Sequence, residues 1–233
     1  MLTTTDQQAI ADKQFDDWWN MPGDWVEPPN QRRGGESGVR ILQPDAPTVC
    51  RLYCKRQVGH LYRSLLHPCG QPTVLREQAA YQAFATLHIR TPRLLYCAAR
   101  KQGGQWQGLL ITEALEDGFS SLEQWSENNA SGGLVFRQAV LQQLGIALAG
   151  VHLSRWQHGC CYPKHLFVKA SQENNAETQV SIAFIDLEKS RQRWRFQDAS
   201  RHDLQQLWRH WGKKFQDDWA LMLKAYRQRV DAA

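Results

Sequence analysis

The residues best suited to chemistry lie in two short segments in the second half of the chain. The first, residues 157–168, reads as a turn rich in reactive side chains, His158 and Cys160 among them, that runs into a short apolar strand. The second, residues 181–188, has the pattern of a buried strand that ends on a carboxylate, Asp186. A reactive turn followed by such a strand is a common way to build a site for a nucleotide and a metal ion.

The reactive turn follows the order of the kinase catalytic-loop pattern H-R-D-x-x-x-x-N, with replacements. His158 holds the first position, and Gly159 stands in place of the Arg. Cys160 stands where the Asp that receives the substrate proton would be, and His165 stands where the Asn that holds a second metal would be. A neutral imidazole can still bind a metal, so we expect His165 and Asp186 to form the metal site. Cys160 decides whether the chain is an enzyme.

A strand and a helix in the first half supply a second pair of charged side chains. Apolar spacing predicts a helix over residues 72–84 whose inner side carries Ala80 and Tyr81. Glu77 precedes these two residues by three and four positions, so it points inward and needs a cation. Lys55, in the strand before the helix, is the natural partner, because kinases hold the phosphates of ATP with such a pair. The alternative is that Lys55 is a surface residue unrelated to Glu77.

Three more positions bear on nucleotide binding. Gly35 and Gly38 keep part of a G-x-G-x-x-G turn that enters a strand, and Glu113 ends a later strand where the chain would pass into its second half. Tyr53 shares a strand face with Lys55, at a position where kinases usually carry a small residue. The ring of Tyr53 would then fill the space that adenine needs.

A run of alternating cations follows Asp186. In an extended segment, Lys189, Arg191, Arg193 and Arg195 would all lie on one face, because strand side chains alternate. We expect this face to bind an anionic substrate. The alternative is a solvated strand edge protected by charge.

Composition places the chain among ordinary globular proteins. It has 233 residues, of which 42% are hydrophobic, and a net charge of +5, enough for one large domain or a small two-lobed one. The first residues carry no basic start and apolar run, and we expect no segment long enough to span a membrane. The six cysteines form no C-x-x-C pair, so we expect thiols in a reducing, cytoplasmic compartment.

A structural zinc site in the reactive turn is disfavoured. Its candidate ligands would be Cys160, Cys161, His158 and His165. Their spacings differ from those of structural zinc sites.

Pattern along the chain predicts an α+β protein with a small antiparallel-sheet lobe and a mostly helical lobe. We expect an N-terminal extension over residues 1–30, a first lobe over 31–113 and a second lobe over 114–233. In the second lobe, two roles are open for Asp203, which lies near the start of a helix. It can begin that helix only, or it can also hydrogen-bond the backbone of the reactive turn.

These motifs together resemble the InaA-type branch of the lipopolysaccharide kinase (Kdo/WaaP) family, which has a protein-kinase-like fold. The resemblance covers nearly the whole chain, and its last three motifs are specific in combination. The motifs are residues 23–27, 32–34, 53–56, 72–77, 157–162 and 184–191.

The resemblance implies an ATP-dependent phosphotransferase that acts on sugar hydroxyls of the lipopolysaccharide core. It implies ATP and Mg²⁺ as cofactors, with Lys55 on the phosphates, Glu77 orienting Lys55 and Asp186 on the magnesium ion. The implied partner is lipopolysaccharide core or another anionic glycan, met at the inner face of the inner membrane. Because Cys160 replaces the Asp of the broader family, the alternative is a pseudokinase that serves as a regulatory or binding module.

Nucleic acid is a weak third alternative for the basic run. Trp194 lies among the cations, but stacking of bases requires several exposed aromatic side chains.

Overall fold

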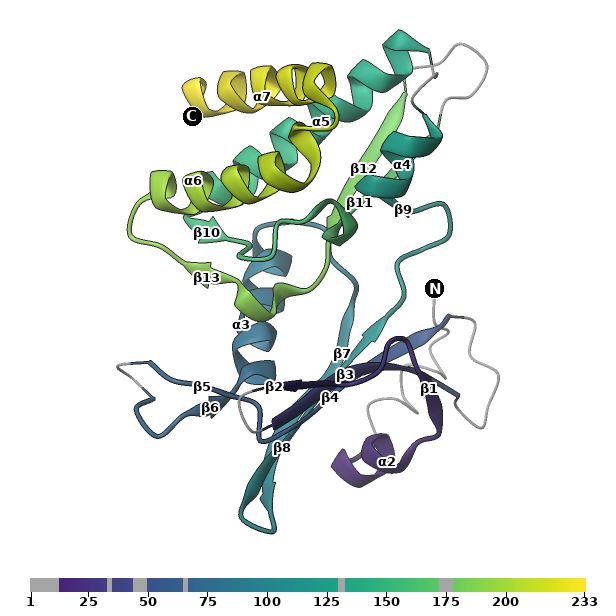
Figure 1. The fold of residues 1–233 in the computed structure, drawn as a ribbon, viewed down its shortest axis with the longest axis vertical. Coiled ribbons are helices and arrows are strands. Elements are labelled where there is room, and N and C mark those ends of the chain that lie inside the picture. The colour runs from purple at the N-terminus through teal and green to yellow at the C-terminus, as the bar shows by residue number, and fades with distance from the viewer. Residues whose placement is uncertain (1–12, 33–34, 44–49, 65–66, 130–132, 172–177) are drawn as a thin grey trace. The chain divides into compact units, whose positions relative to one another are not determined.

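The chain divides into two compact units (Figure 1). The computed structural model describes residues 13–32, 35–43, 50–64, 67–129, 133–171 and 178–233. The first unit comprises residues 1–79 and 92–115, and the second comprises residues 80–91 and 116–233. The expected division at residues 30 and 113 stays a prediction.

An antiparallel sheet forms the first unit. Its strands run in the order β1-β3-β4-β8-β7, and β2 pairs with β3. The bounds are β1 Gly23–Trp25, β2 Asn30–Arg32, β3 Gly35–Leu42, β4 Leu52–Val58, β7 Leu94–Gln102 and β8 Gln105–Glu113. A separate short pair consists of β5 (Leu61–Tyr62) and β6 (Gln71–Pro72). Strand β3 pairs antiparallel with β4, in agreement with the antiparallel sheet expected for the first lobe.

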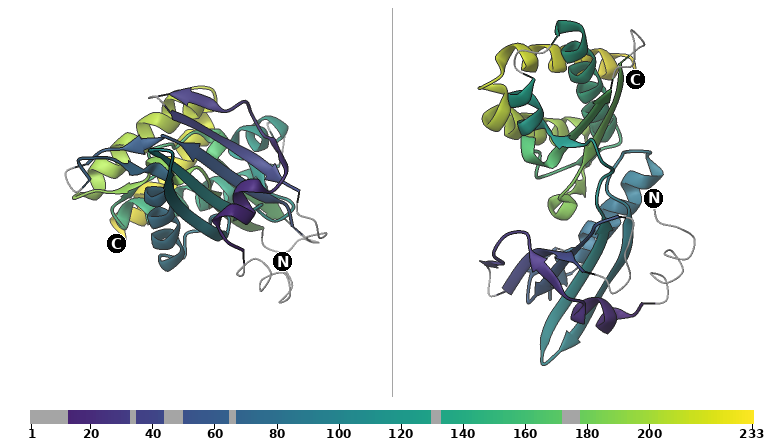
Figure 2. Two further views of the ribbon diagram at one scale, coloured as in Figure 1. Left: turned by 90° about the horizontal axis from the view of Figure 1, so that it is seen from below. Right: turned by 90° about the vertical axis from the view of Figure 1, so that its right-hand side faces the viewer.

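The core of the first unit lies between the sheet and helix α2 (Phe15–Asn20). Trp18 of α2 is only 1% exposed and packs in one cluster with Leu52 of β4 and Ile111 of β8. Helix α2 lies beside the strands in each view (Figures 1 and 2). A segment from the expected N-terminal extension therefore completes the core of the sheet, as burial of a large aromatic side chain favours.

Helix α3 (Thr73–Thr86) follows β6 and confirms the helix predicted from residue 72. Pro72 directly precedes the first helical residue. Thr73, 1% exposed, donates a hydrogen bond from Oγ1 to Oε1 of Gln57 over 2.8 Å. This buried bond ties the start of the helix to strand β4.

Helices dominate the second unit. They are α4 (Leu122–Asn128), α5 (Leu134–Leu153), α6 (Phe196–Leu207) and α7 (Gln216–Asp231), with a π-helical turn, η3 (Trp208–Gly212), after α6. The hairpin of β11 (Leu166–Ser171) and β12 (Gln179–Phe184) adds β9 (Ser120–Ser121) at its edge. A second short pair joins β10 (Trp156–Gln157) to β13 (Arg191–Gln192). Helices α5, α6 and α7 lie together in Figure 1.

Helix α5 is long and apolar enough, by length and composition, to cross a membrane. Its 20 residues include a window with a mean hydropathy of 1.4, so the expectation that no segment reaches this length is wrong. The core helix of a globular unit passes the same test, and one face of α5 packs against α7. The finding is therefore weak support for a membrane span.

Two glycines of α5 should respond to substitution in opposite ways. A Cβ on Gly145 would lie 2.4 Å from the carbonyl oxygen of Met222 in α7, whereas a Cβ on Gly150 would meet no atom within 4 Å. We expect Gly145→Ala to lower the free energy of unfolding by about 1–3 kcal/mol through overpacking. Gly150→Ala, the matched control, should raise it by up to about 1 kcal/mol through helix propensity. Urea unfolding of both variants measures the difference, and equal effects would contradict the close α5–α7 packing.

Candidate active site

A buried ion pair in the first unit joins strand β4 to helix α3. Nζ of Lys55 lies 2.8 Å from Oε2 of Glu77, with side chains 11% and 3% exposed. Lys55 is held in register between Val39 of β3 and Leu110 of β8. The predicted contact is confirmed, and the alternative of an unrelated surface lysine is wrong. A pair this buried requires both partners, because either charge alone would be costly to leave without a counterion.

The two glycines of the predicted nucleotide turn each have a packing reason. A Cβ on Gly38 would lie 2.7 Å from the indole ring of Trp25. A Cβ on Gly35 would lie 2.6 Å from the carbonyl oxygen of Val58. These contacts account for glycine at both positions without a ligand, so the role of Gly35 and Gly38 in binding ATP stays a prediction. The residues between β2 and β3 lie outside the described residues.

The end of strand β8 is tied down through its backbone. The amide of Glu113 donates to the carbonyl oxygen of Arg93 over 3.0 Å, and the amide of Ala114 donates to that of Arg51 over 2.7 Å. A guanidinium nitrogen of Arg93 also lies 3.6 Å from the Glu113 carboxylate. Both amides are therefore already occupied, and an adenine base bound at Glu113 would have to use other groups. The role of Glu113 stays a prediction.

In the second unit, Asp203 of α6 anchors the reactive turn. Its carboxylate accepts hydrogen bonds from the amides of His158 over 2.6 Å and of Gly159 over 3.0 Å. This contact confirms the second of the two roles left open for Asp203. Gly159 has a φ of 78°, and a Cβ there would lie 2.5 Å from the carbonyl oxygen of Lys189. The turn therefore excludes the Arg of the kinase pattern at this position.

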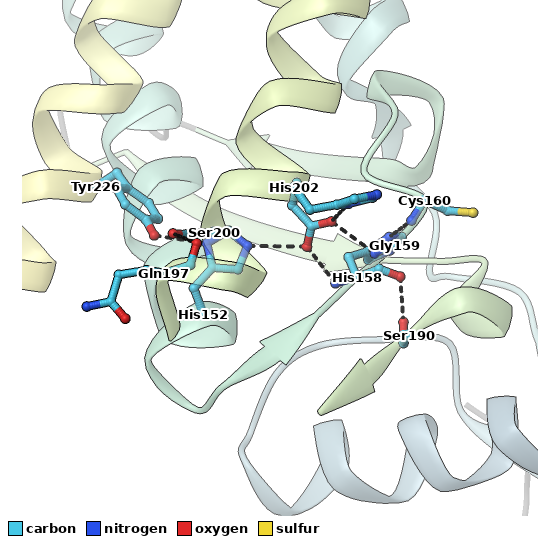
Figure 3. Close-up of polar contacts among 10 residues, drawn as sticks. His152, His158, Gly159, Cys160, Ser190, Gln197, Ser200, His202 and Tyr226 are labelled. Carbon is cyan, nitrogen blue, oxygen red and sulfur yellow. Dashed lines mark hydrogen bonds and ion pairs between the residues drawn. The ribbon is translucent and has the colours of Figure 1, made fainter. Parts of the chain in front are cut away.

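Asp203 stays ionised although its side chain is 0% exposed. Burial alone would raise the pKa of Asp203, but hydrogen bonds from His152 and His202 outweigh it and hold the pKa well below its usual range. Because an ionised carboxylate only accepts, Nε2 of His152 carries a proton toward Asp203 over 3.3 Å. Nδ1 of His152 lies 3.0 Å from the hydroxyl oxygen of Tyr226 (Figure 3). The turn is thus braced by residues from α5, α6 and α7.

His158 acts on the shape of the turn. Its Nδ1 accepts a hydrogen bond from the amide of Cys160 over 3.2 Å, and its carbonyl oxygen accepts one from Ser190 over 2.9 Å. The ring is fully buried, and burial lowers the pKa of His158. A neutral, buried imidazole in these contacts can position its own loop, and a catalytic role for His158 stays a prediction.

Cys160 is a buried thiol at the position of the proton-accepting Asp. It is 4% exposed, and burial together with the nearby Asp186 carboxylate raises its pKa to about 12. Neither Cys160 nor Cys161 is in a disulfide. A thiol with such a pKa holds its proton at neutral pH, and the loss of the base at this position stays a prediction.

Cys160, His165 and Asp186 converge at the end of β12. One potential ligand atom from each side chain lies within 4.8 Å of the others. Nδ1 of His165 lies 2.9 Å from the carbonyl oxygen of Cys160 and 3.5 Å from Oδ2 of Asp186. Asp186 has a left-handed backbone with φ of 58°, which is costly for a residue other than glycine. The two side chains expected to form the metal site, His165 and Asp186, therefore lie close together, and the thiol of Cys160 lies beside them.

Sequence comparison decides the family. The sequence profile of the lipopolysaccharide kinase (Kdo/WaaP) family matches residues 16–226. Protein InaA of Escherichia coli (strain K12) is 38% identical over 215 residues, which is 91% of this chain and 94% of InaA. The chain belongs to the lipopolysaccharide kinase (Kdo/WaaP) family. The resemblance read from the motifs is confirmed.

A solved structure confirms the fold class of this family member. The structure described as WaaP in complex with acyl carrier protein has a TM-score of 0.70 to this chain at 16% identity. The match covers 98% of this chain and 88% of that chain. At this identity the likeness concerns the fold alone, and it bears out the expected α+β, kinase-like class.

The basic run of this family member does not form one extended segment, so that expectation is wrong. Lys189 ends the 3-10 helix η2 (Leu187–Lys189), Arg191 begins β13, and Arg195 is the residue before α6. A helical turn breaks the period of two that would place the four cations, with Arg193, on one face. Their role in substrate binding stays a prediction.

Four residues that brace the reactive turn were missed in the sequence: His152, His202, Ser190 and Tyr226. Their partners lie from 1 to 74 positions away along the chain, and most contacts are long-range. The one local signal was His152, the polar residue in the otherwise apolar stretch 144–153 at the end of α5.

Proposed function

We propose that this protein is an ATP-dependent phosphotransferase that acts on sugar hydroxyls of the lipopolysaccharide core. The observation that carries the proposal is the buried ion pair between Lys55 and Glu77. Kinases use this arrangement to hold the phosphates of ATP, and membership of a kinase family implies use of ATP and a metal ion. Membership of the kinase-like family itself follows from the sequence comparisons.

Transfer by this chain would depend on positioning and charge. Lys55, oriented by Glu77, supplies a fixed positive charge for the phosphates. Asp203 holds the backbone of His158 and Gly159, so the turn that meets the acceptor is rigid. Phosphoryl transfer requires little proton removal early in a loose transition state. A chain without a base at Cys160 would then be slow, by about 10²- to 10⁴-fold, rather than inert.

The family implies a magnesium ion, but the groups around Asp186 suit this ion poorly. Mg²⁺ prefers oxygen ligands in octahedral geometry. Of the three converging side chains, Asp186 offers oxygen, whereas His165 offers nitrogen and Cys160 offers sulfur. No step of the proposed reaction is therefore assigned to magnesium.

The acceptor and the location belong to the same proposal. Lys189, Arg191 and Arg195 are exposed, and Arg193 is half-buried. Such cations suit an anionic glycan such as the lipopolysaccharide core even without a common face. Action on this acceptor would place the protein in the cytoplasm, at the inner face of the inner membrane.

The second candidate function is a pseudokinase that binds partners without transferring phosphate. The observation in its favour is Cys160, a buried thiol with a pKa of about 12 in the place of the base. Incubation with ATP labelled at the γ-phosphate and core oligosaccharide separates the two candidates. Labelled sugar phosphate supports the transferase, whereas nucleotide binding without product supports the pseudokinase.

Lys55→Met should abolish most ATP binding. The variant removes a charge-assisted hydrogen bond to phosphate worth about 1.5–3 kcal/mol, so we expect affinity for ATP to fall by at least about tenfold. Lys214→Met is the matched control, because it breaks an exposed ion pair with Glu127. Calorimetric titration with ATP measures both. Unchanged affinity in Lys55→Met, in protein whose circular dichroism matches the original, would refute a nucleotide site at Lys55.

A further inference from the structure

We propose that Cys160, His165 and Asp186 form a binding site for one soft divalent transition-metal ion, with Zn²⁺ as the reference ligand, in place of the magnesium site of the family. The proposal concerns metal binding only. It would hold for an inactive pseudokinase as well as for a transferase, so it goes beyond the proposed function.

The donor set is the first argument. Thiolate sulfur, imidazole nitrogen and carboxylate oxygen are the three ligand types of protein-bound zinc, and thiolate selects soft metals against magnesium. Three protein ligands with one open position are typical of zinc sites that accept a water or a substrate atom. The sulfur and nitrogen donors that suit magnesium poorly are therefore among the ligands that zinc prefers.

Geometry is the second argument. In a tetrahedral site with bonds of about 2.0–2.3 Å, ligand atoms lie roughly 3.3–3.8 Å apart. The three atoms here lie within 4.8 Å of one another, so each pair must close by at most about 1.5 Å to reach these tetrahedral spacings. Nδ1 of His165 lies 3.5 Å from Oδ2 of Asp186, so the imidazole ring is already beside the carboxylate.

The rigidity of the surroundings is the third argument. Cys160 directly follows the amides that Asp203 holds, and the carbonyl of Cys160 contacts the ring of His165 at 2.9 Å. His165 ends the 3-10 helix η1 (Pro163–His165), whose first residue is proline. The ligands are therefore placed before a metal arrives, which lowers the entropic cost of binding.

Access from solvent is graded across the site. The side chain of Asp186 is 31% exposed and that of His165 is 14% exposed, whereas Cys160 is buried. An ion from solvent would therefore meet the carboxylate first and the sulfur last. Binding forms a sulfur–metal bond and breaks the S–H bond of Cys160, whose proton passes to the buffer.

The test is a metal titration of the full chain after removal of metals with a chelator. We expect one equivalent of Zn²⁺ to bind at least about 100-fold more tightly than Mg²⁺. Titration with Co²⁺ should give the near-ultraviolet absorption of a thiolate–cobalt bond. Cys160→Ser should remove this absorption and weaken Zn²⁺ binding by at least about 100-fold.

Cys161→Ser is the matched control, because Cys161 is the adjacent thiol and is also buried. It should keep the cobalt absorption. The proposal is overturned if Mg²⁺ binds as tightly as Zn²⁺, or if Cys160→Ser retains the absorption. Should Cys160→Ser fail to fold, Asp186→Asn decides: weaker Zn²⁺ affinity with the absorption retained supports the site, and unchanged affinity overturns it.

Discussion

Replacing Asp203 with alanine should lower the free energy of unfolding by about 3–5 kcal/mol, because it breaks a buried, charged network. The change removes the acceptor for the amides of His158 and Gly159. It also leaves His152 without its carboxylate partner in a site with 0% exposure. Urea unfolding measures the loss.

Asp231→Ala is the control for Asp203→Ala. Asp231 is exposed at the end of α7, so its loss should change the free energy of unfolding by no more than about 0.5 kcal/mol. Similar losses in the two variants would show that the Asp203 network contributes little to stability.

The stabilisation from Asp203 should also depend on pH. Its pKa is lowered in the folded protein from an ordinary value of 3.8. The stabilising effect is therefore fully present above pH 3.8 and is lost as the pH falls toward the folded pKa. The difference in stability between the original protein and Asp203→Asn should accordingly shrink in acid.

Cys160→Asp should raise phosphotransferase turnover by about 10²-fold or more, because it supplies the missing base. Cys160→Ser is the control, since a hydroxyl adds no base. Turnover is measured as transfer of the γ-phosphate of ATP to core oligosaccharide. Both variants are assayed with Mg²⁺ and with Zn²⁺, because aspartate also replaces a sulfur donor with oxygen. If Cys160→Asp abolishes an activity that the original protein has, Cys160 itself is the functional group.

Local patterns in the sequence predicted the elements that carry the charged residues. The pattern along the chain predicted an antiparallel sheet in the first lobe, and helical spacing predicted α3 from residue 72. The pairing of Lys55 with Glu77 followed, because an inward carboxylate on α3 requires a cation from the neighbouring strand. These features depend on neighbours within 22 positions along the chain.

Features set by distant contacts could not be predicted in this way. The basic run was expected to be extended. Its first cation, Lys189, instead belongs to the 3-10 helix η2, which begins at the fully buried Leu187. Gly159 is explained only by the Lys189 carbonyl against which it packs. The bond from the amide of His158 to Asp203, 45 positions away, was one of two roles left open, because no local pattern decides between them.

The Asp203 anchor also sets the order in which this protein can mature on the ribosome. Synthesis proceeds from the N-terminus at about 5–20 residues per second, so residues 158–160 emerge before their anchor exists. Asp203 comes 44 positions after Gly159, and Tyr226, which bonds His152, comes 74 positions after that histidine. The nascent chain therefore carries an unformed reactive turn until its last helices are made, and the site is among the final parts of the protein to take shape.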